Sequence, residues 1–242
     1  WVTVAPTVLF IVNDPVAPPA MLGDVFSELG YDTDTFAVVE PERVLDPACA
    51  VQFPDPLNYD VVVPLGARWA VYDERLQETW VADEMALVRA ADAAGVGVLG
   101  VCFGGQLVAQ AFGGAVRRSA DPEIGWHQVS TDAPDLVPGG PWFQWHFDRF
   151  DVPPGAVELA RNGRAAQAFV IGHSMGLQFH PELDGPLLEA WLANDGAEAI
   201  AMGLQPDELR SATAQLHDGA ARRLRALVRG FTDRVVRQPC PS

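Results

Sequence analysis

Short apolar runs rich in β-branched residues alternate with stretches of helical spacing over the first 200 residues. Continuous apolar runs predict buried strands, and apolar residues that recur every three or four positions predict helices. The predicted strands are residues 7–12, 34–39, 60–64, 96–101, 126–130, 142–147, 167–171 and 175–179; the predicted helices are residues 20–29, 78–94 and 104–112. Residues 41–58, rich in Pro and Asp, are predicted to form a loop. This alternation is typical of an α/β sheet protein.

Beyond residue 186 the pattern becomes helical. One apolar stripe predicts a single helix, or a helix broken near Gly219 and Gly230; it consists of Leu209, Ala212, Leu216, Ala220, Leu224, Leu227, Phe231 and Val235. The other face of this helix carries Arg222, Arg223, Arg225 and Arg229. A helix docked on its own domain with a solvated basic face is the favoured interpretation, and a surface for a partner or a second copy is the alternative.

The composition bounds the class of protein. With 242 residues, 49% hydrophobic and 20% charged, the chain can bury a core, so a disordered chain or a disulfide-stapled miniprotein is not expected. The longest apolar run, residues 93–101, is far shorter than the roughly 20 residues of a membrane helix. Neither a membrane segment nor a secretory leader is indicated, and the cytoplasm is the expected location. The chain opens on Trp1, so we expect that a residue or tag has been removed.

Net charge and cysteine spacing limit which partners and metal sites can be expected. The 16 basic and 32 acidic residues give a formal charge of −16, which repels a phosphate backbone, so no nucleic-acid partner is expected. The cysteines Cys49, Cys102 and Cys240 are far apart and lack the paired spacing of a zinc site. They are therefore predicted to be free thiols.

The sharpest chemical feature is a cysteine between a predicted strand and a predicted helix, in Gly100-Val101-Cys102-Phe103-Gly104-Gly105-Gln106. Glycines two positions before and after Cys102 allow a tight strand-to-helix turn, which is the geometry of a nucleophile elbow. The start of the following helix stabilises a thiolate, and it places the Phe103 N–H beside the sulfur as an oxyanion donor. A small cysteine buried in a glycine turn fits the same heptapeptide equally well.

A base for this nucleophile stands at the end of a later strand, in Gln178-Phe179-His180-Pro181-Glu182. Side chains alternate along an extended chain, so His180 and Glu182 point to the same side. Glu182 can then accept a hydrogen bond from one imidazole nitrogen and direct the other toward Cys102. A lone histidine after an apolar strand is usually structural, but the nearby carboxylate and the elbow together favour a catalytic triad.

These two motifs, in this order and about 80 residues apart, resemble those of the class I glutamine amidotransferases, whose Cys-His-Glu triad releases ammonia from glutamine. Residues 123–126, 145–148 and 150–156 resemble the branch related to the glutaminase domain of GMP synthase. The likeness runs from about residue 7 to residue 191. It implies a flavodoxin-like three-layer sandwich with a mainly parallel sheet and the site at the strand ends. We expect the amidotransferase domain over residues 1–190 and a helical extension over residues 191–242 packed on the same domain.

The resemblance also implies roles for particular residues. Cys102 is the nucleophile, His180 is the general base and acid, and Glu182 orients the imidazole. The remaining implied roles are substrate binding, for Gln106 of the motif and for Phe147 and Asp148 at the places where relatives grip the amino-acid end of glutamine.

The oxyanion hole departs from the family pattern. The family's second donor lies in a Gly-Gly-Pro loop after the third strand, and Gly66-Ala67-Arg68 stands in that place here. The Ala67 N–H would join the Phe103 N–H, but alanine adopts fewer backbone conformations than glycine, so whether the hole is preformed stays open. A further departure is Gly105, where many relatives carry histidine before the glutamine.

The implied activity is hydrolysis of the glutamine side-chain amide through a cysteine thioester, giving glutamate and ammonia without a cofactor or metal. The chain has no room for a synthetase domain, so the ammonia would pass to a synthetase on a separate polypeptide. Two alternatives remain: a stand-alone hydrolase of γ-glutamyl peptides or conjugates, and a non-catalytic amidotransferase-like regulatory module.

Three other patterns carry less weight. Residues 95–100 match the dinucleotide motif G-x-G-x-x-G, but they lie inside a predicted strand, whereas the true motif follows one. His146, Asp148 and His180 could form an iron site, but alternating helices and strands disagree with the β architecture usual for such oxygenases. The tryptophans at 126, 142 and 145 indicate either an aromatic-lined pocket or ordinary core packing.

Overall fold

The computed structural model describes residues 4–236, and within them nine strands form one sheet in the order β2-β1-β3-β4-β9-β8-β7-β5-β6. The strands are β1 (Thr7–Val12), β2 (Asp32–Ala37), β3 (Val61–Pro64), β4 (Gly97–Val101), β5 (Val116–Thr131), β6 (Gly140–Phe150), β7 (Val157–Arg161), β8 (Ala166–Ile171) and β9 (Ser174–Leu177).

The sheet has a parallel half and an antiparallel half. Strands β2, β1, β3, β4 and β9 run parallel in the flavodoxin-like order, whereas β8, β7, β5 and β6 continue the sheet antiparallel. The predicted α/β class and flavodoxin-like fold are therefore confirmed. In a parallel sheet the carboxyl ends of the strands share one edge, so the residues that follow β1, β3, β4 and β9 are brought together.

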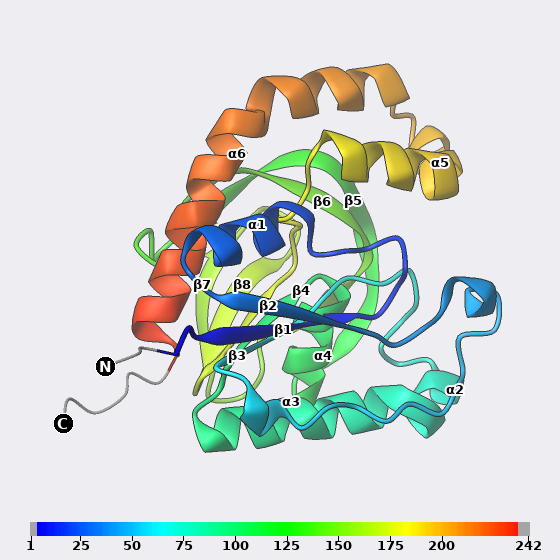
Figure 1. Cartoon of the computed structure of the whole chain (residues 1–242). Helices are drawn as coiled ribbons and strands as arrows, with labels where there is room; N and C mark the ends of the chain where they lie inside the picture. The colour runs from blue at the N-terminus through cyan, green and yellow to red at the C-terminus, as the bar shows by residue number, and fades with distance from the viewer. Residues whose placement is uncertain (1–3, 237–242) are drawn as a thin grey trace.

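Helices cover both faces of the sheet (Figure 1). Alternate side chains of β1 enter different layers: Val8 and Phe10 pack with α1 (Ala20–Glu28) and α6 (Pro206–Arg234), whereas Leu9 and Ile11 pack with α3 (Ala82–Ala94) and α4 (Phe103–Ala111). These two cores make the predicted three-layer sandwich. The remaining helical segments are α5 (Gly185–Ala201), α2 (Glu74–Leu76), the π-helical turn η3 (Gln77–Val81) and the 3₁₀ turns η1 (Pro41–Arg43) and η2 (Pro56–Asn58).

Helix α6 is continuous through both of its internal glycines. A side chain at Gly230 would place its Cβ 2.4 Å from the Asp135 carbonyl oxygen, so this glycine permits close contact with a loop and does not break the helix. The apolar stripe is confirmed, since six of its members are buried: Leu209, Ala220, Leu224, Leu227, Phe231 and Val235.

The basic face of α6 is partly used inside the molecule. Arg225 forms two hydrogen bonds to the Glu28 carboxylate of α1, at 2.7 and 3.0 Å. The Arg223 guanidinium lies over the Trp142 ring, 5.3 Å from its centroid. The boundary expected at residue 190 falls inside α5, and the division into a domain and an extension stays a prediction.

Several element bounds differ from those predicted. Strand β7 was missed, and β5 begins at Val116, ten residues earlier than predicted, because pairing with β6 imposes extended structure on a polar segment. The helix predicted from Glu78 begins at Glu74, where the Asp73 side chain accepts a hydrogen bond from the Arg75 N–H and caps it. Strand β2 begins and ends two residues earlier than predicted, on an exposed edge that lacks apolar alternation.

Candidate active site

Cys102 stands on a strained turn between β4 and α4. Its backbone angles, φ 51° and ψ −105°, are rarely adopted by a residue with a side chain. The flanking glycines explain how the turn is tolerated: a Cβ at Gly100 would lie 2.4 Å from the Gly104 carbonyl oxygen, and one at Gly104 would lie 2.0 Å from the Pro64 carbonyl oxygen. The predicted elbow geometry is therefore present.

Gly105, the departure from many relatives, has a local cause. A Cβ there would lie 2.2 Å from the Leu177 carbonyl oxygen, which accepts a hydrogen bond from the Cys102 N–H at 2.9 Å. The backbone of β9 therefore passes so close to the elbow that position 105 leaves no space for a side chain.

His180 is fixed beside the elbow from three directions. Its Nδ1 lies 2.7 Å from a Glu182 carboxylate oxygen, and its backbone N–H donates to the Phe143 carbonyl oxygen at 2.8 Å. Its ring contacts the Trp191 ring edge-on, with centroids 4.7 Å apart. The imidazole is therefore held in one orientation, with Glu182 behind it and Cys102 among its electrostatic partners.

The charge state of His180 follows from these neighbours. Burial is the largest single influence and lowers the pKa of the imidazole. The charges of Glu182 and Cys102 and the side-chain hydrogen bonds to both outweigh it, and they raise the pKa of His180 to about 10. The site therefore favours an imidazolium that can give a proton to a leaving group.

The segment Gly66–Ala67 closes one side of the elbow. A Cβ at Gly66 would lie 3.1 Å from His180 Cε1 and 3.9 Å from the Cys102 Cβ, so the backbone of this segment faces both side chains. Gly66 and Ala67 line the same cavity as Cys102 and His180. The structure therefore places Gly66 and Ala67 beside Cys102 and His180 in one cavity, and their oxyanion role stays a prediction.

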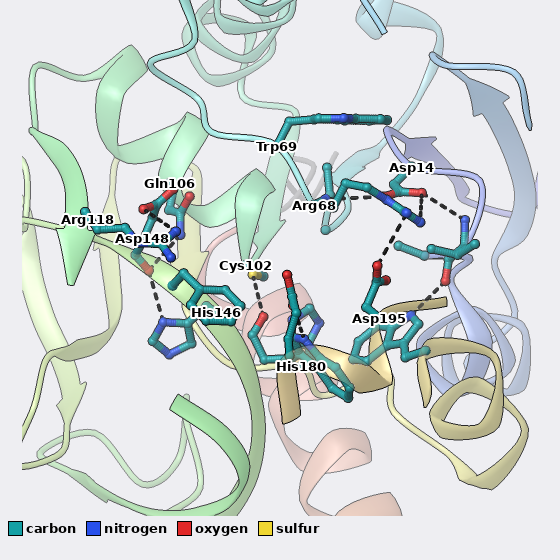
Figure 2. Close-up of a pocket in the computed structure, with 18 of the residues that line it drawn as sticks. Asp14, Arg68, Trp69, Cys102, Gln106, Arg118, His146, Asp148, His180 and Asp195 are labelled. Atoms are coloured by element: carbon teal, nitrogen blue, oxygen red, sulfur yellow. Dashed lines mark hydrogen bonds and ion pairs between the residues drawn. The ribbon is translucent and has the colours of Figure 1, made fainter. Parts of the chain in front are cut away.

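Two of the predicted substrate residues, Gln106 and Asp148, lie on the opposite side of Cys102 from Arg68 (Figure 2), and Phe147 lines the same cavity. The Gln106 side-chain amide donates to the Asp148 carbonyl oxygen at 3.1 Å, and the Tyr72 hydroxyl donates to the Asp148 carboxylate at 2.9 Å. The Arg118 guanidinium lies over the Phe147 ring, 4.7 Å from its centroid. Gln106 thus also holds the backbone of the segment predicted to grip the substrate.

A buried polar network holds the backbone of the segment that contains Phe147 and Asp148. His146 Nδ1 lies 3.0 Å from the Asp148 carbonyl oxygen, and its Nε2 lies 3.4 Å from the Glu123 carboxylate. Asn162 and Gln167 donate to the same carboxylate at 2.7 and 3.2 Å. Burial, the largest influence, raises the pKa of Glu123, but the hydrogen bonds and charges around it, chiefly those of His146, lower it overall. The segment that begins at Glu123 therefore supplies a buried carboxylate that contacts His146, which in turn contacts the Asp148 backbone.

A cavity of about 380 Å³ joins these groups, with Cys102 between two polar ends (Figure 2). One end holds Gln106, Arg118 and Asp148, and the other holds Asp14, Arg68 and Asp195. At the second end, Arg68 Nε donates to the Asp14 carboxylate at 2.7 Å, and Arg68 also pairs with Asp195 at 3.5 Å.

Of the three tryptophans singled out in the sequence, only Trp145 lines the cavity. Trp142 stacks on Phe179 inside the core, with ring centroids 4.6 Å apart, and Trp126 donates a hydrogen bond to Thr213 of α6.

Sequence reasoning missed several residues of this cavity, among them Asp14, Arg68, Trp191 and Asp195. Asp14 could have been found, because it follows a strand whose carboxyl end lies at the edge where sites form in parallel sheets. Trp191 and Asp195 lie on α5, and their approach to the cavity depends on how that helix packs.

Metal and membrane sites find no support within residues 4–236. In that range no three His, Cys, Asp or Glu side chains come together as potential metal ligands, and no helix is both long and apolar enough to cross a membrane. Cys49 and Cys102 are free thiols, as predicted, and Cys240 lies outside the described residues.

The comparison with protein families agrees with this geometry. The sequence model described as "Glutamine amidotransferase class-I" matches residues 72–197, which is more than half of the chain. The chain belongs to the class I glutamine amidotransferase family.

Relatives among curated proteins match a shorter stretch. A glutamine-hydrolysing GMP synthase of Thermomicrobium roseum is 39% identical over 97 residues, which cover 37% of this chain and 18% of that protein. One subunit of a glutamine-hydrolysing GMP synthase of Saccharolobus solfataricus is 33% identical over 97 residues, covering 36% of this chain and 52% of that protein. The matched stretch thus spans from about a fifth to a half of the length of these relatives.

Solved structures match nearly the whole chain. A glutamine amidotransferase from Thermotoga maritima superposes with a TM-score of 0.81 and 25% identity, covering 94% of this chain and 99% of that one. A glutamine amidotransferase from Methylobacillus flagellatus gives a TM-score of 0.80 at 22% identity, with 98% of both chains covered. The fold, including its two C-terminal helices, is therefore shared over almost the full length.

Proposed function

We propose that this chain hydrolyses the side-chain amide of glutamine, with Cys102 as nucleophile, His180 as general base and acid, and Glu182 as the group that orients the imidazole. One observation carries the proposal: a cysteine on a strained elbow and a histidine bonded to a carboxylate at 2.7 Å face one cavity. This is the arrangement that nucleophilic acyl transfer requires.

The first half-reaction forms a thioester. The Cys102 thiolate attacks the amide carbon, and the negative charge that develops on the amide oxygen is stabilised by the Phe103 and Ala67 N–H groups. The His180 imidazolium gives its proton to the amide nitrogen, the carbon–nitrogen bond breaks, and ammonia leaves.

The second half-reaction releases glutamate. Neutral His180 takes a proton from water, and the resulting hydroxide attacks the thioester carbonyl. The carbon–sulfur bond then breaks and Cys102 leaves as a thiolate, which restores the starting pair. In both half-reactions Glu182 accepts a hydrogen bond from His180 Nδ1, so His180 Nε2 stays available for proton transfer.

The amino-acid end of glutamine is proposed to bind on the side of Gln106, Phe147 and Asp148. Support comes from the fixed backbone there, because the Asp148 carbonyl oxygen receives the Gln106 amide and lies 3.0 Å from His146 Nδ1. The partly exposed Arg118 adds a positive charge at this end, close to Asp148 at 3.9 Å.

A γ-glutamyl peptide or conjugate is a second candidate substrate. The cavity continues past Cys102 to Arg68 and to α5, where Asp195, Glu198 and Ala201 line it. The amino group released from glutamine is too small to fill this second end, whereas a larger amine on a γ-glutamyl bond would occupy it.

A separate synthetase subunit is proposed as the consumer of ammonia if glutamine is the substrate. The support is the name of the Saccharolobus solfataricus relative, which is one subunit of a glutamine-hydrolysing GMP synthase. In this layout residues 1–190 form the amidotransferase domain and residues 191–242 an extension on it.

The test compares wild type and Cys102→Ala on glutamine and on a γ-glutamyl dipeptide, with glutamate, ammonia and released amine measured. Ammonia from glutamine that disappears in Cys102→Ala supports the amidotransferase, and amine from the dipeptide alone supports the second candidate. Added candidate synthetases test activation by a partner. If wild type releases no product under any of these conditions, the catalytic proposal is wrong and a non-catalytic regulatory role stands in its place.

A further inference from the structure

The oxyanion segment Gly66–Ala67 is flanked by two hydrogen bonds from consecutive residues at the carboxyl end of β1. The Asn13 side-chain amide donates to the Leu65 carbonyl oxygen at 3.2 Å. The Asp14 carboxylate accepts from the Arg68 N–H, also at 3.2 Å. One bond therefore fixes the chain just before the segment, and the other fixes it just after.

These two bonds restrict the peptide that carries the donor. Each peptide unit is planar and trans, so fixing the Leu65 carbonyl fixes the whole unit that it shares with Gly66. Fixing the Arg68 N–H likewise fixes the unit that it shares with Ala67. The unit between them carries the Ala67 N–H, and with both neighbours held its remaining motion is a flip about the line that joins its two Cα atoms. Ala67 has a negative φ, and such a flip would take it to the positive φ that alanine disfavours.

Asn13 is itself held by a buried carboxyl group. Glu84 of α3 is fully buried, and its Oε1 accepts from the Asn13 amide nitrogen at 3.2 Å. Within residues 4–236, neither Asn13 Oδ1 nor Glu84 Oε2 has a hydrogen-bond partner, although both atoms are buried. A proton on Glu84 Oε2 directed at Asn13 Oδ1 would satisfy both atoms together, because a carboxylic acid and a primary amide can exchange two hydrogen bonds.

We propose that Asn13 and Asp14 are positioning residues that hold the Gly66–Ala67 peptide as an oxyanion donor, and that a neutral Glu84 carboxylic acid locks the Asn13 amide. This inference rests on the proposed function, since an oxyanion donor has a role only in acyl transfer. It also gives a reason why the segment can use alanine: its shape is imposed by side chains from β1 and α3 in place of glycine's conformational freedom.

The surroundings of Glu84 agree with a neutral acid. Burial, the larger influence, raises its pKa, and the Asn13 hydrogen bond lowers it less, which leaves the pKa of Glu84 at about 8. The elements packed on α3 include β4, α4 and η2, which contain no charged residue within their bounds. Besides Glu84, helix α3 carries Asp83, Arg89 and Asp92, and the η3 turn packed on it carries Glu78. The Asp14–Arg68 and His180–Glu182 pairs lie beside the Gly66–Ala67 segment.

The first test uses substitutions at pH 7, with kcat and KM for the Cys102-dependent reaction as readouts. Glu84→Gln keeps both hydrogen bonds, since an amide can donate where the acid did, so its kcat should match wild type. Glu84→Leu and Asn13→Leu release the Leu65 carbonyl, and their kcat should fall by roughly 10- to 100-fold, with KM changed less than about twofold. That fall stays below the 10²- to 10³-fold cost of deleting a donor outright.

Two control variants separate positioning from general destabilisation. Val88→Ala removes buried volume from the same helix and should lower stability without lowering kcat. Asp83→Asn changes an exposed carboxylate next to Glu84 and should alter neither. If Glu84→Gln loses as much kcat as Glu84→Leu, or if Asn13→Leu keeps wild-type kcat, the positioning role is wrong.

The second test is the pH profile. Above about pH 8 the ionised Glu84 would face Asn13 Oδ1 without a proton between them, so wild-type kcat should fall where that of Glu84→Gln does not. As the pH rises from 4.5 to 8, the wild-type midpoint of thermal unfolding should also fall relative to that of Glu84→Gln. Over this range Glu84 keeps its proton in the folded state and loses it in the unfolded state. If the unfolding midpoints of wild type and Glu84→Gln change with pH in the same way, the proposal that Glu84 is a neutral acid in the folded protein is wrong.

The two measurements also separate this inference from the proposed function. The unfolding profiles need no catalysis, so they test the Glu84 proton even if neither glutamine nor a γ-glutamyl amide is hydrolysed. Complete absence of Cys102-dependent hydrolysis in wild type would contradict the proposed function and the positioning role with it. Normal hydrolysis with unchanged kcat in Asn13→Leu would contradict the positioning role alone.

Discussion

The elbow at Cys102 and the segment Gly66–Ala67 lie side by side in the cavity, but different forces hold them. The elbow is shaped by backbone contacts so close that glycine alone fits at Gly100 and Gly104. The neighbouring segment is shaped by hydrogen bonds from Asn13 and Asp14. Steric shaping leaves a local motif in the sequence, whereas shaping by distant side chains leaves none, although both determine how the site is arranged.

The largest effect on stability should come from Gly104→Ala, which places a side chain in the tightly packed elbow. The new Cβ would overlap the Pro64 carbonyl oxygen at 2.0 Å, and neither backbone can move without disturbing β3 or α4. We expect a loss of about 4 kcal/mol or more in the free energy of unfolding, measured by urea denaturation. Gly163→Ala is the control, because its Cβ would meet nothing within 4 Å. Equal stability of the two variants would show that the elbow tolerates side chains.

The largest effect on activity, as distinct from stability, should come from Glu182→Gln, which removes the charge behind His180 but keeps the shape of the side chain. In Ser-His-Asp triads, neutralising the orienting carboxylate costs up to ~10⁴-fold in kcat, and for the proposed triad we expect a loss of that order in ammonia release. A loss below tenfold would mean that Glu182 does not orient the imidazole.

The same variant should change the pH dependence of stability. The pKa of His180 is raised in the folded state from 6.5 to about 10, so its stabilising contribution is fully present below pH 6.5 and is lost as the pH rises through 10. Without the Glu182 charge this slope should flatten between pH 6.5 and 10, as measured by thermal unfolding across that range. If the pH dependence of the unfolding midpoint is unchanged in Glu182→Gln, a group other than the His180–Glu182 pair causes it.

Gly66→Ala tests the segment held by hydrogen bonds with the same chemical change as Gly104→Ala. Its Cβ would approach His180 Cε1 at 3.1 Å, a contact that a side chain can relieve by a small shift. We expect stability within about 1 kcal/mol of wild type but kcat lower by roughly tenfold, because a small misplacement of catalytic groups is costly. Parallel measurements of unfolding and turnover would check it, and a folding defect like that of Gly104→Ala would erase the contrast between the two regions.

The same contrast explains how far the sequence could be interpreted. The fold class was predictable, and so was the placement of Cys102 and His180 in one cavity with Glu182 bonded to the imidazole, because glycine spacing and strand alternation are local patterns. The catalytic roles of these residues stay a proposal. Strand β7 and the first part of β5 were not, since these polar segments become strands through their partners. Glu84 looks in sequence like an ordinary helix carboxylate, and only packing buries it beside Asn13.

The smallest effect should come from Tyr72→Phe, which changes neither side of the elbow but the end of the cavity where the substrate's amino-acid group is proposed to bind. The Tyr72 hydroxyl donates to the Asp148 carboxylate at 2.9 Å. Asp148 is buried, but Tyr72 is 42% exposed, so water can take the place of the lost hydroxyl. A net hydrogen bond of this kind contributes about 0.5–1.5 kcal/mol, which corresponds to a rise in KM of about two- to tenfold at unchanged kcat. A fall in kcat with constant KM would instead place Tyr72 with Gly66 among the groups that act on the transition state, and the binding end and the reacting centre would no longer be separable.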